Sequence, residues 1–104
     1  MRAAIGLVAL LLSLVPARAE NWAIGVGAKS CAFWLSTPVL QAAGVTWITG
    51  FWSGLNYVSD KTVGMHTDNE GLFAEIKKIC QEHPSKDLTD ATWEVYRMIE
   101  DQHR

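Results

Sequence analysis

The sequence predicts an all-α protein, a small bundle of three to four helices stapled by one disulfide. Apolar residues recur at three- and four-residue steps in three separate segments, which is the spacing of one helix face. The chain contains only two cysteines, Cys31 and Cys80. No segment shows the alternation of apolar and polar residues that is typical of a half-buried strand. These observations favour helices tied together by a single covalent link.

The first nineteen residues have the layout of a secretory signal peptide. Arg2 gives a short positive start, residues 3–15 are an apolar run, and residues 17–19 (ARA) form a small-x-small cleavage site. The alternative is an uncleaved membrane anchor, but the run is shorter than the roughly 20 residues that a spanning helix needs. We therefore predict cleavage after Ala19, a periplasmic single domain of residues 20–104, and no membrane contact after cleavage.

The mature chain is expected to be mildly acidic. Cleavage removes Arg2 and Arg18 from the nine basic residues and none of the eleven acidic residues. The formal charge is then about −4 at pH 7. No basic patch indicates nucleic-acid binding, so no nucleic-acid partner is expected. A single core is marginal at this length, and small exported domains often add a disulfide.

Both cysteines follow the predicted cleavage site, so both would reach an oxidising compartment, where a cysteine pair normally bonds. Cys31 and Cys80 allow only one intramolecular connectivity. The loop of about 50 residues that it closes corresponds to roughly 4 kcal/mol of stabilisation in the chain-entropy account. A metal-binding pair or a redox-active thiol is the alternative, but neither a CxxC spacing nor a neighbouring His supports it. The sequence predicts a structural disulfide.

The first long helix is expected over residues 38–59, with Thr37 as N-cap and Pro38 at the first helical position. Gly44 leaves open whether this element is one helix or two. A short helix over residues 30–35 precedes it, after an irregular lead-in at residues 24–28. The side chains of the predicted buried face are Ile48, Phe51, Trp52, Leu55 and Val58.

The second helix starts at the capping-box pattern T-D-N-E, in which Thr67 is the N-cap and Glu70 reaches back to the backbone. A polar connection over residues 60–66 precedes it, and His83-Pro84 ends it. Apolar residues line one side of this helix. They are Leu72, Phe73, Ile76, Ile79 and Cys80.

The third helix is expected from about Asp87 to Gln102. Asp87 and Asp90 lie in its first turn, where negative charge suits the helix dipole. An inner stripe of small and apolar residues follows the helical period. Its members are Leu88, Ala91, Thr92, Val95 and Ile99.

Residues 47–60, WITGFWSGLNYVSD, place aromatic side chains around two glycines four residues apart. A glycine inside a helix costs about 1 kcal/mol relative to Ala, so Gly50 and Gly54 indicate a packing role. The favoured interpretation is a helix crossing in the core. The alternative is a groove for a partner or client. The candidate binding residues are Trp47, Gly50, Phe51, Trp52, Gly54 and Tyr57.

Three motifs follow one another along the chain: "CAFWL" at Cys31, "TPV" before a Trp-bearing helix, and "GLFAEIKKICQEHPSKDL" around Cys80. Together they resemble the HdeA/HdeB family of small periplasmic acid-stress chaperones over roughly residues 30–99. The resemblance implies a helical fold, a periplasmic location, and a bond between the two cysteines. The stretch "GFWSGLNY" is richer in Gly and Trp than expected for those chaperones. A related plan also occurs in small periplasmic immunity proteins, which usually carry additional cysteines.

No recognisable catalytic constellation is present. The three His residues are scattered, and no Ser lies in a nucleophile motif. His66, Asp68 and Glu70 are candidate metal ligands, but their place at a helix start accounts for the two acids without a metal. We therefore expect no enzymatic activity, no cofactor and no metal site.

The favoured function is that of a holdase-type chaperone for unfolded periplasmic proteins. Asp and Glu have reference pKa values near 4, so below about pH 3 the mature chain would carry a formal charge near +11. Self-repulsion would loosen the bundle, while the disulfide would limit its opening. Aromatic side chains would then become available to clients. They are Trp47, Phe51, Trp52, Phe73 and Trp93.

Two other functions are open. An immunity- or inhibitor-type protein would bind one specific protein partner at neutral pH through the Gly/Trp surface. A structural exported protein would have no client. A homodimer formed through the aromatic helix is a further hypothesis, because a small chain with this many aromatic residues has little core in which to bury them.

Overall fold

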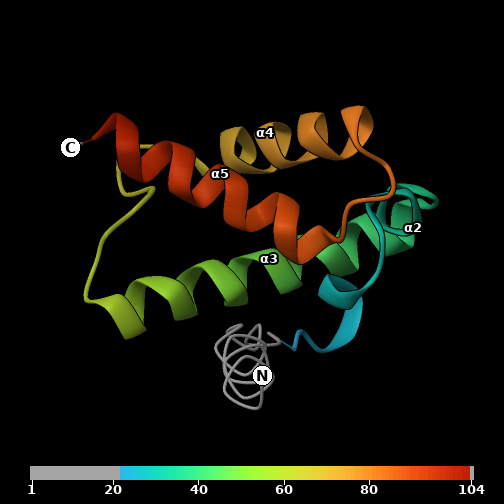
Figure 1. The fold of residues 1–104 in the computed structure, drawn as a ribbon, viewed down its shortest axis with the longest axis horizontal. Helices are drawn as coiled ribbons and strands as arrows, with labels where there is room; N and C mark the ends of the chain where they lie inside the picture. The colour runs from blue at the N-terminus through green and yellow to red at the C-terminus, as the bar shows by residue number, and fades with distance from the viewer. Residues whose placement is uncertain (1–21, 104) are drawn as a thin grey trace, which may run out of the picture.

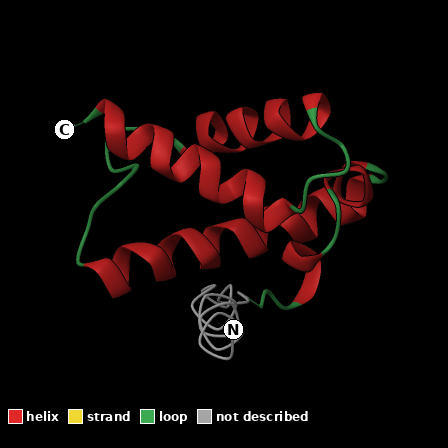
Figure 2. Ribbon diagram, viewed as in Figure 1, coloured by secondary structure: helices red, strands yellow, loops and turns green. Residues whose placement is uncertain are grey.

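A computed structural model describes residues 22–103, so the predicted signal peptide and its cleavage site lie outside the described residues. The all-α prediction is confirmed, because the described part contains helices and no strand. Figures 1 and 2 show that α3, α4 and α5 alternate in direction and that α5 packs against both of the others. The elements are η1 (Gly25–Ala28), α2 (Cys31–Leu35), α3 (Pro38–Ser59), α4 (Asn69–Glu82) and α5 (Leu88–Gln102).

Gly44 does not interrupt α3, which is one continuous helix of 22 residues. Thr37 is its N-cap, since the side-chain oxygen accepts a hydrogen bond from the N–H of Leu40 at 3.1 Å. Gly44 has a packing role instead. A Cβ atom at this position would lie 2.0 Å from Nε1 of Trp34, so the indole of α2 lies directly against the backbone of α3. Residues 38–59 therefore form one helix and not two.

The N-cap of α4 is Asp68, so the predicted capping box is wrong by one residue. The Asp68 carboxylate accepts a hydrogen bond from the N–H of Gly71 at 2.6 Å. The N–H of Thr67 donates to the carbonyl of Gly64, which makes Thr67 part of the preceding turn. An Asp caps a helix at least as well as a Thr and adds a charge that suits the dipole, which accounts for the later start. The predicted stop is confirmed, with His83 as the C-cap.

The predicted inner stripe of α5 is buried in full. Its one polar member, Thr92, donates its hydroxyl to the carbonyl of Leu88 at 2.8 Å, so its burial leaves no donor unpaired. Asp87 is the N-cap residue, although its side chain makes no capping hydrogen bond. Tyr96 is also buried, which the sequence pattern did not predict.

The lead-in is a short 3-10 helix, η1, rather than irregular chain. The indole N–H of Trp47 donates to the carbonyl of Ile24 at 2.8 Å, and the hydroxyl of Thr89 donates to the carbonyl of Gly27 at 2.6 Å. A Cβ atom at Gly27 would lie 2.0 Å from the Trp47 ring, so the backbone approaches this ring as closely as only glycine permits. The lead-in is therefore fastened to both α3 and α5.

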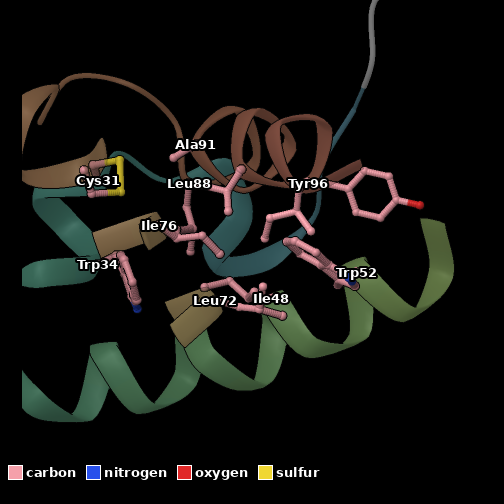
Figure 3. Packing of buried hydrophobic residues seen from close by; sticks show 12 residues of the cluster. Cys31, Trp34, Ile48, Trp52, Leu72, Ile76, Leu88, Ala91 and Tyr96 are labelled. Atoms are coloured by element: carbon pink, nitrogen blue, oxygen red, sulfur yellow. A yellow bond between two sulfur atoms is a disulfide. The ribbon is translucent and has the colours of Figure 1, made fainter. Parts of the chain in front are cut away.

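The predicted disulfide is confirmed. Cys31 and Cys80 are bonded, with their Cα atoms 4.9 Å apart, which ties α2 to the last turns of α4. Figure 3 shows the disulfide at one end of the buried cluster and Trp52 with Tyr96 at the other. The buried apolar residues are Cys31, Trp34, Ile48, Trp52, Leu72, Ile76, Cys80, Leu88, Ala91, Val95, Tyr96 and Ile99. Other members of the predicted faces are only partly buried, namely Phe51, Leu55, Phe73 and Ile79.

At the end away from the disulfide, Asn56 ties the loop after α3 to α3 and α5. Its side-chain amide exchanges two hydrogen bonds of 3.0 Å with the backbone of Val63, and its Oδ1 also accepts from the Tyr96 hydroxyl at 2.8 Å. The indole N–H of Trp52 donates to the same Val63 carbonyl at 2.8 Å. Because the loop covers the Asn56 side of the helix, Val58 is 90% exposed, and its predicted burial is wrong.

Candidate functional site

The structure separates the six predicted binding residues into three groups. Trp47 and Phe51 line a groove beside α5. Trp52 faces the core, is only 6% exposed, and is not accessible to a partner in this conformation. The remaining three are exposed on the outer side of α3. They are Gly50, Gly54 and Tyr57.

The predicted helix crossing at the glycine pair is wrong. A Cβ atom at Gly50 or Gly54 would meet nothing within 4 Å, so no described element packs on this side of α3. The neighbouring helices pack instead on the side that carries Gly44, Ile48 and Trp52. The outer face of α3 carries no charged side chain. Even so, neither α3 nor any other described helix is long and apolar enough to cross a membrane.

An open groove of about 860 Å³ lies where the lead-in, α3 and α5 meet. Its lining is mostly aromatic and aliphatic, with two carboxylates on the α5 side. The lining residues are Trp22, Ala23, Ile24, Ala28, Trp47, Phe51, Leu55, Asp87, Thr89, Asp90 and Trp93. We refer to it as the aromatic groove.

The principal rings of the aromatic groove are held in place by other rings. Trp47 stacks on Phe51 with centroids 4.9 Å apart and an interplanar angle of 14°. Trp93 stacks on the buried Tyr96 at 5.7 Å and 4°, while 41% of Trp93 stays exposed. Rings that are already fixed lose little conformational freedom when a ligand covers them, so the groove is preorganised for apolar contact.

The carboxylates of Asp87 and Asp90 form no ion pair with any residue between 22 and 103. The basic side chains of two adjoining segments are engaged with other residues. Lys86 pairs with Glu94 at 2.7 Å. The ammonium of Lys29 lies over the Phe33 ring, 5.8 Å from its centroid. The two carboxylates therefore give the rim of the groove a local negative charge.

From the sequence, Asp87 and Asp90 were assigned only to the start of a helix. Trp93 was assigned only to the aromatic side chains that become available to clients in acid. Their spacing is informative, because residues three apart are neighbours on a helix surface. The Asp90–Trp93 pair therefore marks an acidic and aromatic row along α5. No sequence pattern indicates that the lead-in contributes to the groove, because only the tertiary fold brings Trp22 and Ile24 to it.

Two ion pairs fasten connecting segments to α5. Lys61, in the loop after α3, pairs with Glu100 at 2.5 Å, and Lys86, in the loop after α4, pairs with Glu94. The side chains are partly exposed, so each pair contributes at most about 1 kcal/mol. Both depend on an ionised carboxylate, which makes them sensitive to acid.

The candidate metal ligands are not assembled into a site. Asp68 caps α4, and His66 lies beside His103, with ring centroids 6.1 Å apart. Within the described part of the chain, no group of three or more His, Cys, Asp or Glu side chains could hold a metal ion.

Comparison with protein-family models, curated protein sequences and solved structures finds no match. The resemblance to the HdeA/HdeB family stays a prediction, based on the motifs at residues 31–39 and 71–88. The disulfide itself indicates an oxidising compartment. The described part of the chain is a small disulfide-bonded helical protein with an open aromatic groove.

Proposed function

We propose that this is an exported periplasmic protein that binds non-native polypeptides during acid stress, as a holdase-type chaperone. The observation that carries the proposal is the aromatic groove, an apolar surface that is accessible in the folded chain and is built from fixed rings. Export is supported by the signal-peptide pattern of the first nineteen residues and by the disulfide.

Acid would enlarge this surface by weakening the attachments of the loops. Protonation of Glu94 and Glu100 removes both ion pairs, and protonation of Asp68 weakens the cap of α4. Each loss amounts to at most about 1 kcal/mol, whereas a small domain has about 5 kcal/mol or more of net stability. Repulsion within a chain of formal charge near +11 supplies the remainder. The disulfide is unaffected by acid and keeps α2 on α4.

The test is suppression of client aggregation, measured by light scattering. Residues 20–104 are mixed with an enzyme that aggregates at pH 2.5, and the same mixture is measured at pH 7 with heat-unfolded client. We expect strong suppression at pH 2.5 near equimolar ratio. The variant Phe51→Ser/Trp93→Ser should suppress less. Tyr57→Ser, which removes a 92% exposed ring outside the groove, should behave as the parent chain. Unsuppressed scattering at pH 2.5 would refute the proposal.

A second candidate function is recognition of one specific protein partner at neutral pH, as in an immunity or inhibitor protein. It is favoured by the same groove, because a preformed surface on a disulfide-tied bundle needs no acid to become available. Recovery of a single stoichiometric partner at pH 7, together with no suppression of aggregation at pH 2.5, would select this function over the chaperone.

Homodimerisation through α3 is also retained as a hypothesis. The outer face of α3 presents Gly50, Gly54 and Tyr57 without a charged side chain. A monomeric mass at high concentration, measured by light scattering, would contradict it.

A further inference from the structure

We propose that the aromatic groove selects, at neutral pH, polypeptide segments that combine apolar side chains with Lys or Arg. The inference rests on the proposed function in that it takes the groove as a binding site, and it adds the chemical class of the segment bound. It comes from one juxtaposition: the carboxylates of Asp87 and Asp90, which form no ion pair within residues 22–103, line the same groove as the partly exposed ring of Trp93.

The net charge at this rim is negative. The N-terminus of α5 contributes the equivalent of roughly half a positive charge, and the two carboxylates contribute two negative ones, so about −1.5 remains. Lys86 and Lys29 do not compensate it, because one pairs with Glu94 and the other lies over the Phe33 ring. An anionic segment would be repelled from this rim, and a cationic one would be attracted.

Helix stability explains why acidic residues stand at the start of α5, but it does not explain why an exposed aromatic ring lies next to them. Asp87 makes no capping hydrogen bond, so helix capping does not occupy its carboxylate oxygens. Asp90 precedes Trp93 by three residues, which places carboxylate and indole side by side on one helix surface. A Lys or Arg side chain at this point would meet a carboxylate and the ring type that binds cations best. Arg97, one turn further along, does not line the groove.

The rest of the groove suits an apolar side chain next to the cation. The stacked pair of Trp47 and Phe51, together with Leu55, forms a wall that carries no charge. The volume of about 860 Å³ lies near the upper end of the roughly 300–1,000 Å³ of small-molecule sites. A short stretch of chain fills such a space better than a single cation does. The chemistry therefore fits a basic amphipathic segment.

The experiment measures binding of three fluorescein-labelled nine-residue peptides to the disulfide-bonded mature chain at pH 7, by fluorescence anisotropy. The peptides alternate Leu with Lys, with Gln or with Glu. We expect the Lys peptide to bind at least tenfold more tightly than the Glu peptide, with the Gln peptide between them. Raising NaCl from 0.05 to 0.5 M should weaken only the binding of the Lys peptide, because exposed charges are screened.

The charge variant is Asp87→Asn/Asp90→Asn, which keeps an N-cap residue of equal quality. It should bind the Lys peptide about three- to tenfold more weakly, since each exposed charge pair contributes modestly. The matched control, Asp60→Asn/Glu82→Gln, removes two exposed carboxylates that do not line the groove and should leave the affinity unchanged. Trp93→Leu should weaken the Lys peptide more than the Gln peptide. Circular dichroism of each variant checks that the helices are retained.

Equal affinity for the Lys and Glu peptides, or no binding of any peptide, would overturn the inference. An equal loss of Lys-peptide affinity in the charge variant and in the matched control would also overturn it. These outcomes are distinct from failure of the chaperone proposal. Peptide selectivity is measured at pH 7 by fluorescence anisotropy, whereas suppression of client aggregation is measured at pH 2.5 by light scattering on the parent chain. Selectivity at pH 7 and suppression at pH 2.5 can therefore fail independently.

Discussion

Replacing Gly44 or Gly50 by Ala makes the same chemical change in the same helix and should have opposite effects on stability. Ala is favoured over Gly in a helix interior by about 0.5–1 kcal/mol. At Gly50 the added methyl group meets no atom of residues 22–103 within 4 Å. Gly50→Ala should therefore stabilise the protein by that amount, which corresponds to roughly 4 °C in Tm for a domain of this size.

At Gly44 the added Cβ atom would lie 2.0 Å from Nε1 and 2.2 Å from Cδ1 of Trp34. Contacts below 3.0 Å are essentially never found for real Cβ atoms, so the ring must move by about 1 Å. Trp34 is buried, and its indole N–H donates to the carbonyl of Gln41 at 3.0 Å. Overpacking costs about 1–3 kcal/mol and the weakened hydrogen bond about 1 kcal/mol. After the helix-propensity gain, the net destabilisation is about 1–3 kcal/mol.

The assay is thermal unfolding of the oxidised mature chain at pH 7, followed by far-UV circular dichroism. Gly44→Ala should lower Tm by roughly 5–15 °C, and Gly50→Ala should raise it. A rise of equal size in both variants would refute the packing of Trp34 on α3. A fall in both would show that the outer face of α3 is covered, for example by a second copy of the chain.

Three further predictions concern single contacts. Cys31→Ala/Cys80→Ala should reduce the free energy of unfolding in urea by about 4 kcal/mol, because the bond closes a loop with a sequence separation of 49; a loss below 1 kcal/mol would contradict this. Asp68→Ala should cost about 1 kcal/mol and Thr67→Ala clearly less, and equal losses would return the cap to Thr67. Asn56→Ala should lower stability by about 2 kcal/mol, since it leaves loop and α5 groups without partners; an unchanged Tm would show that the loop is held otherwise.

The helices and the disulfide could be predicted from the sequence because local rules govern them. A Pro after a Thr, a three- and four-residue apolar period, and two cysteines behind an export pattern each point to one structure. The cap of α4 was missed by one residue because Thr67 and Asp68 are both good caps, and pattern alone does not choose between them.

The tertiary contacts could not be predicted from the sequence to the same extent. Gly44 and Gly50 look alike in sequence. The Trp34 indole of α2 packs against Gly44, whereas Gly50 is exposed to solvent. Asn56 is a polar residue within an apolar helix, and no sequence pattern indicates that its side chain holds the following loop. The aromatic groove combines residues 22–28, 47–55 and 87–93, which no local period connects.

The position of the Cys31–Cys80 bond gives the bundle two unequal ends. α2 and the last turns of α4 are joined covalently, whereas the loop after α3 and the start of α4 are held by Asn56 and by the Lys61–Glu100 pair. Sub-global opening is therefore expected to begin at the second end, with amide deuterium uptake over residues 60–72 preceding uptake near the cysteines. Partial unfolding would then have a direction, and the segments nearest the sulfur bridge would be the last to lose protection.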